Sequence, residues 1–161
     1  MMSATRPEQL YERDFYAWAQ TQAKELRRFA RTRPNLPLDL AHIAEEIRDL
    51  GKSERDTVFS FAELIMQHLL LVEHSASRDN RTHWLDEIDQ FRTRLRRKLS
   101  PTPRRRLKRA LEEVYADARG TVARKMARYG EDAAAATLPE SCPYEIEQIL
   151  GDWEPSLRNG P

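Results

Sequence analysis

Four histidines and their neighbouring carboxylates are the residues best suited to build a reactive site. His42 and Glu46 are four residues apart, as are His83 and Glu87, and that spacing puts each pair on one face of a helix. Helical bundles hold metals with Glu-x-x-His motifs, and none occurs here. His42, Glu46 and His68 are therefore only weak metal candidates. A histidine on a bundle helix is more often a hydrogen-bonded boundary residue, so we predict no metal and no cofactor.

A strongly basic segment is the second feature with chemical potential. Between Arg92 and Arg109 the chain holds ten arginines and lysines and no acidic residue. The near-neutral total of 27 basic and 26 acidic residues therefore hides a separation of charge. The side chains expected to contact an anion or a partner are Arg96, Arg97, Arg104, Arg105, Arg106 and Lys108.

Three kinds of partner suit this basic segment. Its arginines could pair with acidic helices of the same chain or of a second copy, which is the favoured interpretation. An acidic protein partner is the next, and nucleic acid is the third because arginine grips phosphates at two points. The segment has one aromatic residue at its edge, Phe91, and no helix-turn-helix or glycine-rich phosphate loop. Nucleic-acid binding is therefore the weaker interpretation.

Cys142 is the single cysteine and directly precedes Pro143. The start of a helix lowers a thiol pKa, which would favour reactivity. A catalytic thiol also needs a histidine base close by, and nothing in the sequence places one there. We predict a structural cysteine. A lone cysteine, together with residues 1–10 that lack an apolar leader, predicts a cytoplasmic protein with no membrane segment.

Composition and periodicity predict an all-α helical bundle. The 161 residues are 40% hydrophobic and 33% charged, with five glycines and a mean hydropathy of −0.77. The apolar spacing predicts helices at about 8–32, 39–50, 53–74, 82–99 and 104–129, and a short one at 143–150. We expect one domain over 1–161, with a core at about 8–151 and loose termini at 1–7 and 152–161.

Particular residues set the expected boundaries and burial. Gly51 is expected to end one helix, and Ser53 to begin the next. The helix at 53–74 is apolar on most sides, so it should be the most buried element. The first helix is expected to bury an apolar stripe, whose members are Tyr11, Phe15, Trp18, Gln22, Leu26 and Phe29.

Several short motifs together resemble a known family. They are Tyr11, Asp14, Phe15 and Trp18; Glu46-Ile47; Leu50-Gly51-Lys52-Ser53-Glu54-Arg55; His68-Leu69-Leu70; Trp84, Ile88 and Arg92; Tyr115, Ala118 and Arg119; and Pro139 with Cys142-Pro143-Tyr144. On these residues the chain resembles the bacterial domain-of-unknown-function family 29. The resemblance implies an all-α bacterial cytoplasmic domain and supplies no catalytic residues.

The polar residues shared with that family suggest a network. Asp14, Glu46, His68 and Arg92 are its candidate members, and such a network could form a site or fix the packing. We expect a non-enzymatic helical protein that associates with itself or with a protein partner through its charged faces. The alternatives are nucleic-acid binding by the Arg92–Arg109 segment and, more weakly, a metal protein or enzyme in the bundle core.

Overall fold

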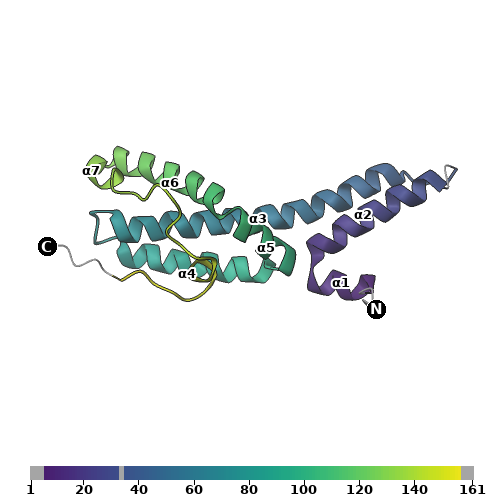
Figure 1. Ribbon diagram of the computed structural model, residues 1–161, viewed down its shortest axis with the longest axis horizontal. Coiled ribbons are helices and arrows are strands. Elements are labelled where there is room, and N and C mark those ends of the chain that lie inside the picture. The colour runs from purple at the N-terminus through teal and green to yellow at the C-terminus, as the bar shows by residue number, and fades with distance from the viewer. Residues whose placement is uncertain (1–5, 33–34, 157–161) are drawn as a thin grey trace. The chain divides into compact units, whose positions relative to one another are not determined.

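Helices joined by loops make up the part of the protein that the computed structural model describes, residues 6–32 and 35–156. Within these ranges there is no strand, which confirms the all-α prediction (Figure 1). The helices are α1 (Pro7–Arg13), α2 (Phe15–Thr32), α3 (Leu40–His74), α4 (Arg81–Lys98), α5 (Pro101–Arg109), α6 (Leu111–Arg128), α7 (Asp132–Ala135) and α8 (Ile146–Leu150). No helix in these ranges is both long and apolar enough to cross a membrane.

Backbone contacts divide the chain into two compact units. The first comprises Met1–Thr57 and Lys98–Arg106, and the second Val58–Arg97 and Leu107–Pro161. The first therefore holds α1, α2, the first half of α3 and most of α5, whereas the second holds the remaining elements. The single domain expected from the sequence stays a prediction.

In the first unit, α2 and α3 pack antiparallel through small side chains. Ala19, Ala23, Ala44 and Gly51 are all buried. A Cβ atom on Gly51 would lie 2.9 Å from the Cβ of Ala19, so the two backbones approach closely only because residue 51 is glycine. The predicted helix stop at Gly51 and start at Ser53 are wrong, because α3 runs unbroken from Leu40 to His74. Gly51 therefore allows α2 and α3 to pack closely and does not end a helix.

Asp14 interrupts the helix predicted over 8–32. Its φ of −155° and ψ of 80° are not helical, so α1 ends before it and α2 begins after it. Its carboxylate accepts a hydrogen bond from the backbone N–H of Ala17 at 3.0 Å, as an N-cap does. Its second oxygen accepts one from the N–H of Thr102 at 2.7 Å, in the first turn of α5. One buried carboxylate thus serves the starts of two helices.

The helix predicted over 104–129 is also divided. α5 begins at Pro101, where proline is compatible with a first helical turn. Ala110 then adopts φ −98° and ψ 12°, and α6 starts at Leu111. The sequence offers no glycine or proline at this break, which explains why periodicity alone joined the two helices.

The core of the second unit is built on the second half of α3. Its fully buried side chains include Val58, Ala62, Ile65, Met66, Leu69 and Leu70, as predicted for a helix that is apolar on most sides. Residues 152–156, expected to be loose, instead lie against the helices. The carbonyls of Trp153 and Pro155 accept hydrogen bonds from Arg92 and Arg81 at 2.7 and 3.0 Å. The rest of that expected tail, 157–161, and residues 1–5 lie outside the described residues.

Candidate functional site

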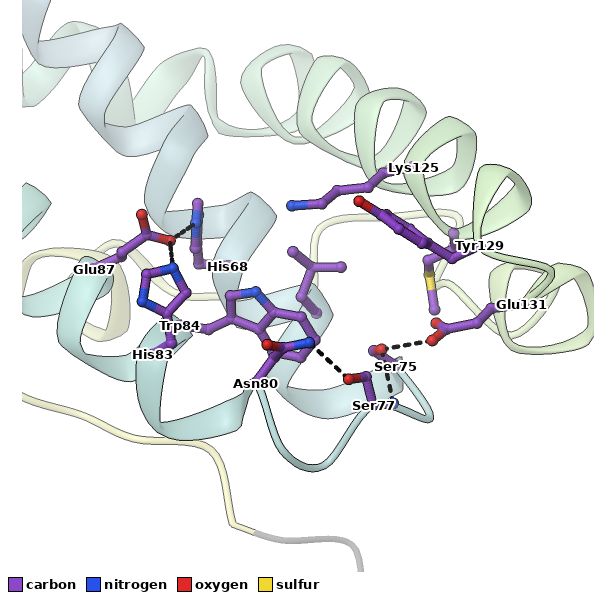
Figure 2. A pocket seen from close by; sticks show the side chains of 12 residues that line it. His68, Ser75, Ser77, Asn80, His83, Trp84, Glu87, Lys125, Tyr129 and Glu131 are labelled. Carbon is purple, nitrogen blue, oxygen red and sulfur yellow. Dashed lines mark hydrogen bonds and ion pairs between the residues drawn. The ribbon is translucent and has the colours of Figure 1, made fainter.

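A pocket of about 600 Å³ lies in the second unit and gathers side chains from four segments (Figure 2). They come from the end of α3, the following loop, the start of α4 and the end of α6 with the turn after it. Leu71, Trp84 and Met126 are its buried apolar members. A volume of this size and a mixed lining are typical of small-molecule sites.

Two histidines converge on one carboxylate at one side of this pocket. His68 Nε2 lies 2.7 Å from Oε2 of Glu87, and His83 Nε2 lies 3.6 Å from the same oxygen. His68 Nδ1 lies 2.7 Å from the carbonyl oxygen of Leu64, which only accepts, so this nitrogen carries a proton. Among the described residues, no hydroxyl, thiol or amine hydrogen-bonds to either imidazole, so the cluster lacks a nucleophile.

The opposite side of the pocket is a chain of hydrogen bonds. Ser75 Oγ donates to Glu131 Oε1 at 3.0 Å and accepts from the backbone N–H of Ser77 at 3.1 Å. Asn80 Nδ2 donates to Ser77 Oγ at 2.8 Å. These bonds fix the loop between α3 and α4. Lys125 lies above the pocket in Figure 2, and its amine points toward the side that holds His68.

The weak metal candidates are not brought together. His42 is exposed and bonds Asp39, which raises the pKa of the histidine and lowers that of the aspartate. Glu46 is exposed on α3 of the first unit, whereas His68 bonds Glu87 in the second. Within the described ranges, no group of three or more histidine, cysteine or acidic side chains could hold a metal ion.

The four residues of the predicted polar network have separate partners. Asp14, His68 and Arg92 are each buried, and Glu46 is exposed. Asp14 caps α2 and contacts α5, and His68 bonds Glu87. The sequence pattern thus picked out three buried polar side chains, but these serve three different places in the fold.

Arg92 fastens the C-terminal segment to α4. Its Nε donates to the carbonyl of Ile149 at 3.1 Å, and its Nη2 donates to those of Gln148 and Trp153, both at 2.7 Å. The side chain is 2% exposed, and burial lowers the pKa of its guanidinium. Three carbonyls therefore take the place of water around a buried charge.

The predicted anion-binding side chains include several with partners of their own. Arg96 donates to the carbonyl of Leu150 at 3.0 Å and to Asp152 at 2.6 Å, which lowers the pKa of that aspartate. Arg106 lies over the ring of Tyr16, 4.9 Å from its centroid. The remaining predicted contacts, Arg97, Arg104, Arg105 and Lys108, are exposed, and Arg105 donates to Thr102.

Cys142 is half-buried, and its environment differs from the one expected. Burial raises the pKa of its thiol, and the S–H donates to the carbonyl of Tyr144 at 3.5 Å. The helix nearby, α8, begins only at Ile146. The expected lowering of the thiol pKa by a helix start is therefore absent, and the residue suits a structural role.

The first unit leaves an apolar face on the α2–α3 pair, and this face includes the stripe of α2 that the sequence predicted to be buried. We call this surface the apolar face; its residues are Phe15, Trp18, Gln22, Leu26 and Phe29 on α2 and Ile43, Ile47 and Leu50 on α3. None of the eight is buried, and Ile43 and Leu50 are 38% and 58% exposed. Tyr11 of α1, itself 48% exposed, extends it, because its ring packs edge-on against Phe15 and Trp18.

Helix geometry places both stripes on the same side. On each helix the stripe is rotated by roughly 80°, in the same sense, from the line of small contact residues, at 3.6 residues per turn. The contacts of Ala19 with Gly51 and of Gln20 with Arg48 show that the helices run antiparallel. Equal rotations on antiparallel helices bring both stripes to one side of the pair.

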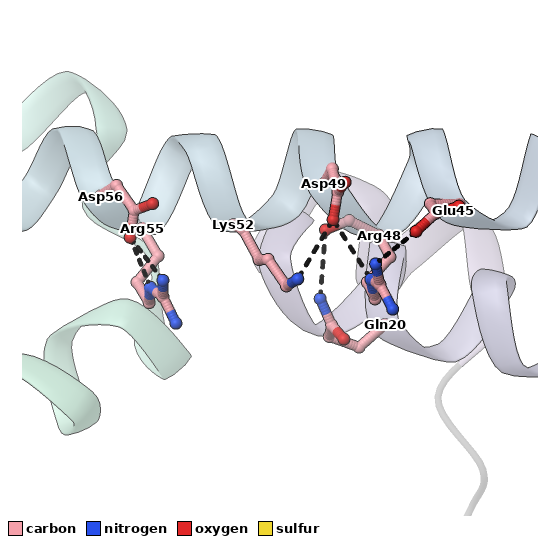
Figure 3. Close-up of polar contacts among 7 residues, drawn as sticks. All are labelled: Gln20, Glu45, Arg48, Asp49, Lys52, Arg55 and Asp56. Carbon is pink, nitrogen blue, oxygen red and sulfur yellow. Dashed lines mark hydrogen bonds and ion pairs between the residues drawn. The ribbon is translucent and has the colours of Figure 1, made fainter.

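The other side of the pair is polar. Arg48 bonds Glu45 at 3.1 Å and Asp49 at 3.2 Å, and Lys52 pairs with Asp49 at 3.2 Å (Figure 3). Gln20 of α2 joins this cluster by donating to the carbonyl of Arg48 at 3.3 Å. The bonds from Lys52 and Arg48 lower the pKa of Asp49, and Lys52 is the larger cause. One side of the helix pair is thus satisfied by its own ion pairs, whereas the other exposes apolar side chains.

Known proteins match this chain in fold and in family. A family model described as "Domain of unknown function DUF29" matches residues 10–154. An α-helical protein of unknown function from Rhodospirillum rubrum, whose crystal structure is known, has a TM-score of 0.78 and 27% sequence identity. That match covers 92% of this chain and 90% of the other. Among curated proteins, none matches the chain.

Proposed function

Starting from the chain's membership of the DUF29 family, we propose that it is a helical association protein that forms a homodimer through the apolar face. The observation that supports this most directly is the contrast between the two sides of the α2–α3 pair. Ion pairs cover one side, whereas the other exposes Ile43, Leu50 and the aromatic group around Trp18. Exposed apolar side chains that share one face mark an interaction surface.

A second copy of the chain suits this face in three ways. The eight residues of the apolar face carry no charge, so two copies would not repel one another there. Two antiparallel helices with one apolar side are half of a four-helix bundle, and a two-fold axis completes it. Gln22 lies within the stripe, where a polar residue can fix the register of packed helices.

The exposed apolar area is just sufficient for a small dimer interface. Tyr11, Phe29, Ile43 and Leu50 are between 38% and 58% exposed, and the other apolar members of the face are partly exposed. With about 200 Å² for each large apolar side chain, this amounts to roughly 500 Å² per copy. Two copies would bury about 1,000 Å², which is about the least area expected of a biological interface.

The sequence favoured association through charged faces, and the apolar face replaces that mechanism in this proposal. Arg96 and Arg106 of the basic segment have partners within their own units. An interface built on apolar contacts also predicts a different response to salt. Raising the ionic strength would dissociate a charge-driven dimer and would leave an apolar one intact.

The experiment is light scattering during size-exclusion chromatography, with matched glutamate substitutions on the two sides of α3. We expect wild type at a mass of about twice the 18.9 kDa of one chain, in both low and high salt. Leu50→Glu buries a charge in the interface and should give monomers. Ala41→Glu adds the same charge at an exposed position away from the apolar face and should stay dimeric.

Two results would contradict the proposal. The first is a wild-type monomer at 100 µM chain. The second is a Leu50→Glu variant with the same mass as Ala41→Glu. A dimer that dissociates as the salt concentration rises would show that charged surfaces, and not the apolar face, form the interface.

A further inference from the structure

The pocket in the second unit plays no part in the association proposed above, yet it has the properties of a ligand site. Its volume is about 600 Å³, within the range of small-molecule sites. Leu71, Trp84 and Met126 supply buried apolar surface. Polar groups surround that surface on two sides, so the pocket suits a ligand with both an apolar and a polar part.

The polar groups on both sides are mostly satisfied within the protein. Glu87 is bonded by His68, and Glu131 accepts from Ser75. Asn80 donates to Ser77. A ligand would therefore form few new hydrogen bonds with these groups, and its polar contacts must come from other side chains of the pocket.

Lys125 is the exception. It is half-buried, and its amine extends over the pocket in Figure 2. Among the described residues it has neither a hydrogen bond nor an ion pair. His83 also lines the pocket. Its Nε2 lies beside Glu87, and its Nδ1 has no hydrogen-bond partner among the described residues. An ammonium held over an apolar surface without a counterion favours an anion beside it.

We propose that this pocket binds a small monocarboxylic acid with an aromatic or similarly flat apolar body. The carboxylate contacts the Lys125 ammonium, and the apolar body lies on Trp84. The carboxylates of Glu87 and Glu131 stand on opposite sides of the pocket and repel a second negative charge. This repulsion selects a monoanion over a dicarboxylate or a phosphorylated ligand.

The test is calorimetric titration of the full chain with benzoate, phenylacetate and indole-3-carboxylate. Benzamide is the neutral match to benzoate, and phthalate is the matching dicarboxylate. We expect at least one of the three acids to bind, and benzamide to bind at least tenfold more weakly than benzoate if benzoate is the one that binds. Lys125→Met should weaken acid binding at least tenfold. Lys24→Met, which changes an exposed lysine of α2 outside the pocket, should leave acid binding unchanged.

An NMR spectrum of the tryptophan indole N–H groups shows where the acid binds. Titration with the acid that binds should shift the Trp84 signal, which is assigned by its loss in Trp84→Phe. Circular dichroism checks each variant, and Lys125→Gln replaces Lys125→Met if that variant is misfolded. The inference is overturned if none of the three acids binds, if the neutral amide binds equally well, if phthalate binds more tightly than benzoate, or if loss of the lysine charge changes nothing.

These outcomes are independent of the dimer. The pocket residues all lie in the second unit, whereas the apolar face lies in the first. Leu50→Glu should therefore keep acid binding, and Lys125→Met should keep the mass of wild type.

Discussion

Replacing Arg92 with methionine removes the three hydrogen bonds that hold the C-terminal segment against α4. A hydrogen bond to a charged group contributes about 1.5–3 kcal/mol, and three carbonyls would be left without a donor. Part of this loss is offset, because methionine does not carry a buried charge. The expected net destabilisation is about 3–5 kcal/mol. At about 2–4 °C per kcal/mol for a chain of this size, Tm should fall by roughly 10 °C.

Urea unfolding followed by circular dichroism measures the change in the free energy of unfolding. Arg92→Lys keeps the charge but lacks the planar fork that reaches several carbonyls, so we expect an intermediate loss of about 2 kcal/mol. Arg97→Met makes the same substitution at an exposed position on α4 and should change stability by less than about 0.5 kcal/mol. The reasoning is refuted if Arg92→Met loses less than about 1 kcal/mol, or if Arg92→Lys matches wild type.

Two further predictions concern a glycine contact and the single thiol. Gly51→Ala should destabilise by about 1–2 kcal/mol, because its Cβ meets that of Ala19 at 2.9 Å, whereas Gly120→Ala in α6 should stabilise by up to about 1 kcal/mol through helix propensity. Urea unfolding of both variants is the check, and effects of the same sign would contradict it. Cys142 should react with iodoacetamide at pH 7.5 at least tenfold more slowly than in urea, because burial raises the pKa of its thiol and leaves less thiolate. Equal rates would show that the thiol is not protected.

The helices could be predicted from periodicity, but their breaks could not. A repeat of apolar residues shows which positions share a face, and it continues through Asp14 and Ala110, where the backbone departs from helical geometry. Aspartate is a preferred N-cap, so the first break had a sequence signal that the repeat concealed. At Gly51 the sequence predicted a helix end that does not exist. A glycine can end a helix, but inside a helix it can also permit close packing.

Burial of polar residues was easier to foresee than their partners. Of the four polar residues that the family resemblance singled out, Asp14, His68 and Arg92 are buried, whereas Glu46 is exposed. Their long-range partners are 88, 19 and 56 or more residues away, and many of them are backbone groups, which carry no residue-specific pattern.

The apolar face was missed for a different reason. Periodicity identified the stripe that contains Phe15 and Trp18, but it cannot say whether a second layer covers that stripe. The first unit packs its helices through alanines and glycine, and these small residues carried little weight in the sequence pattern.

The bonds of Arg92 also have a consequence for how the chain is made. Gln148 follows Arg92 by 56 residues, and Trp153 follows it by 61. At translation rates of about 5–20 residues per second, roughly 3–11 s separate the emergence of Arg92 from that of its first carbonyl acceptor. During that interval Arg92 can pair with Asp89 of the same helix, but its guanidinium lacks the three carbonyl acceptors on the side of α4 that later becomes interior. Final consolidation of the second unit therefore waits for residues 148–153, and a protein truncated before α8 would leave that face exposed to water, chaperones and proteases.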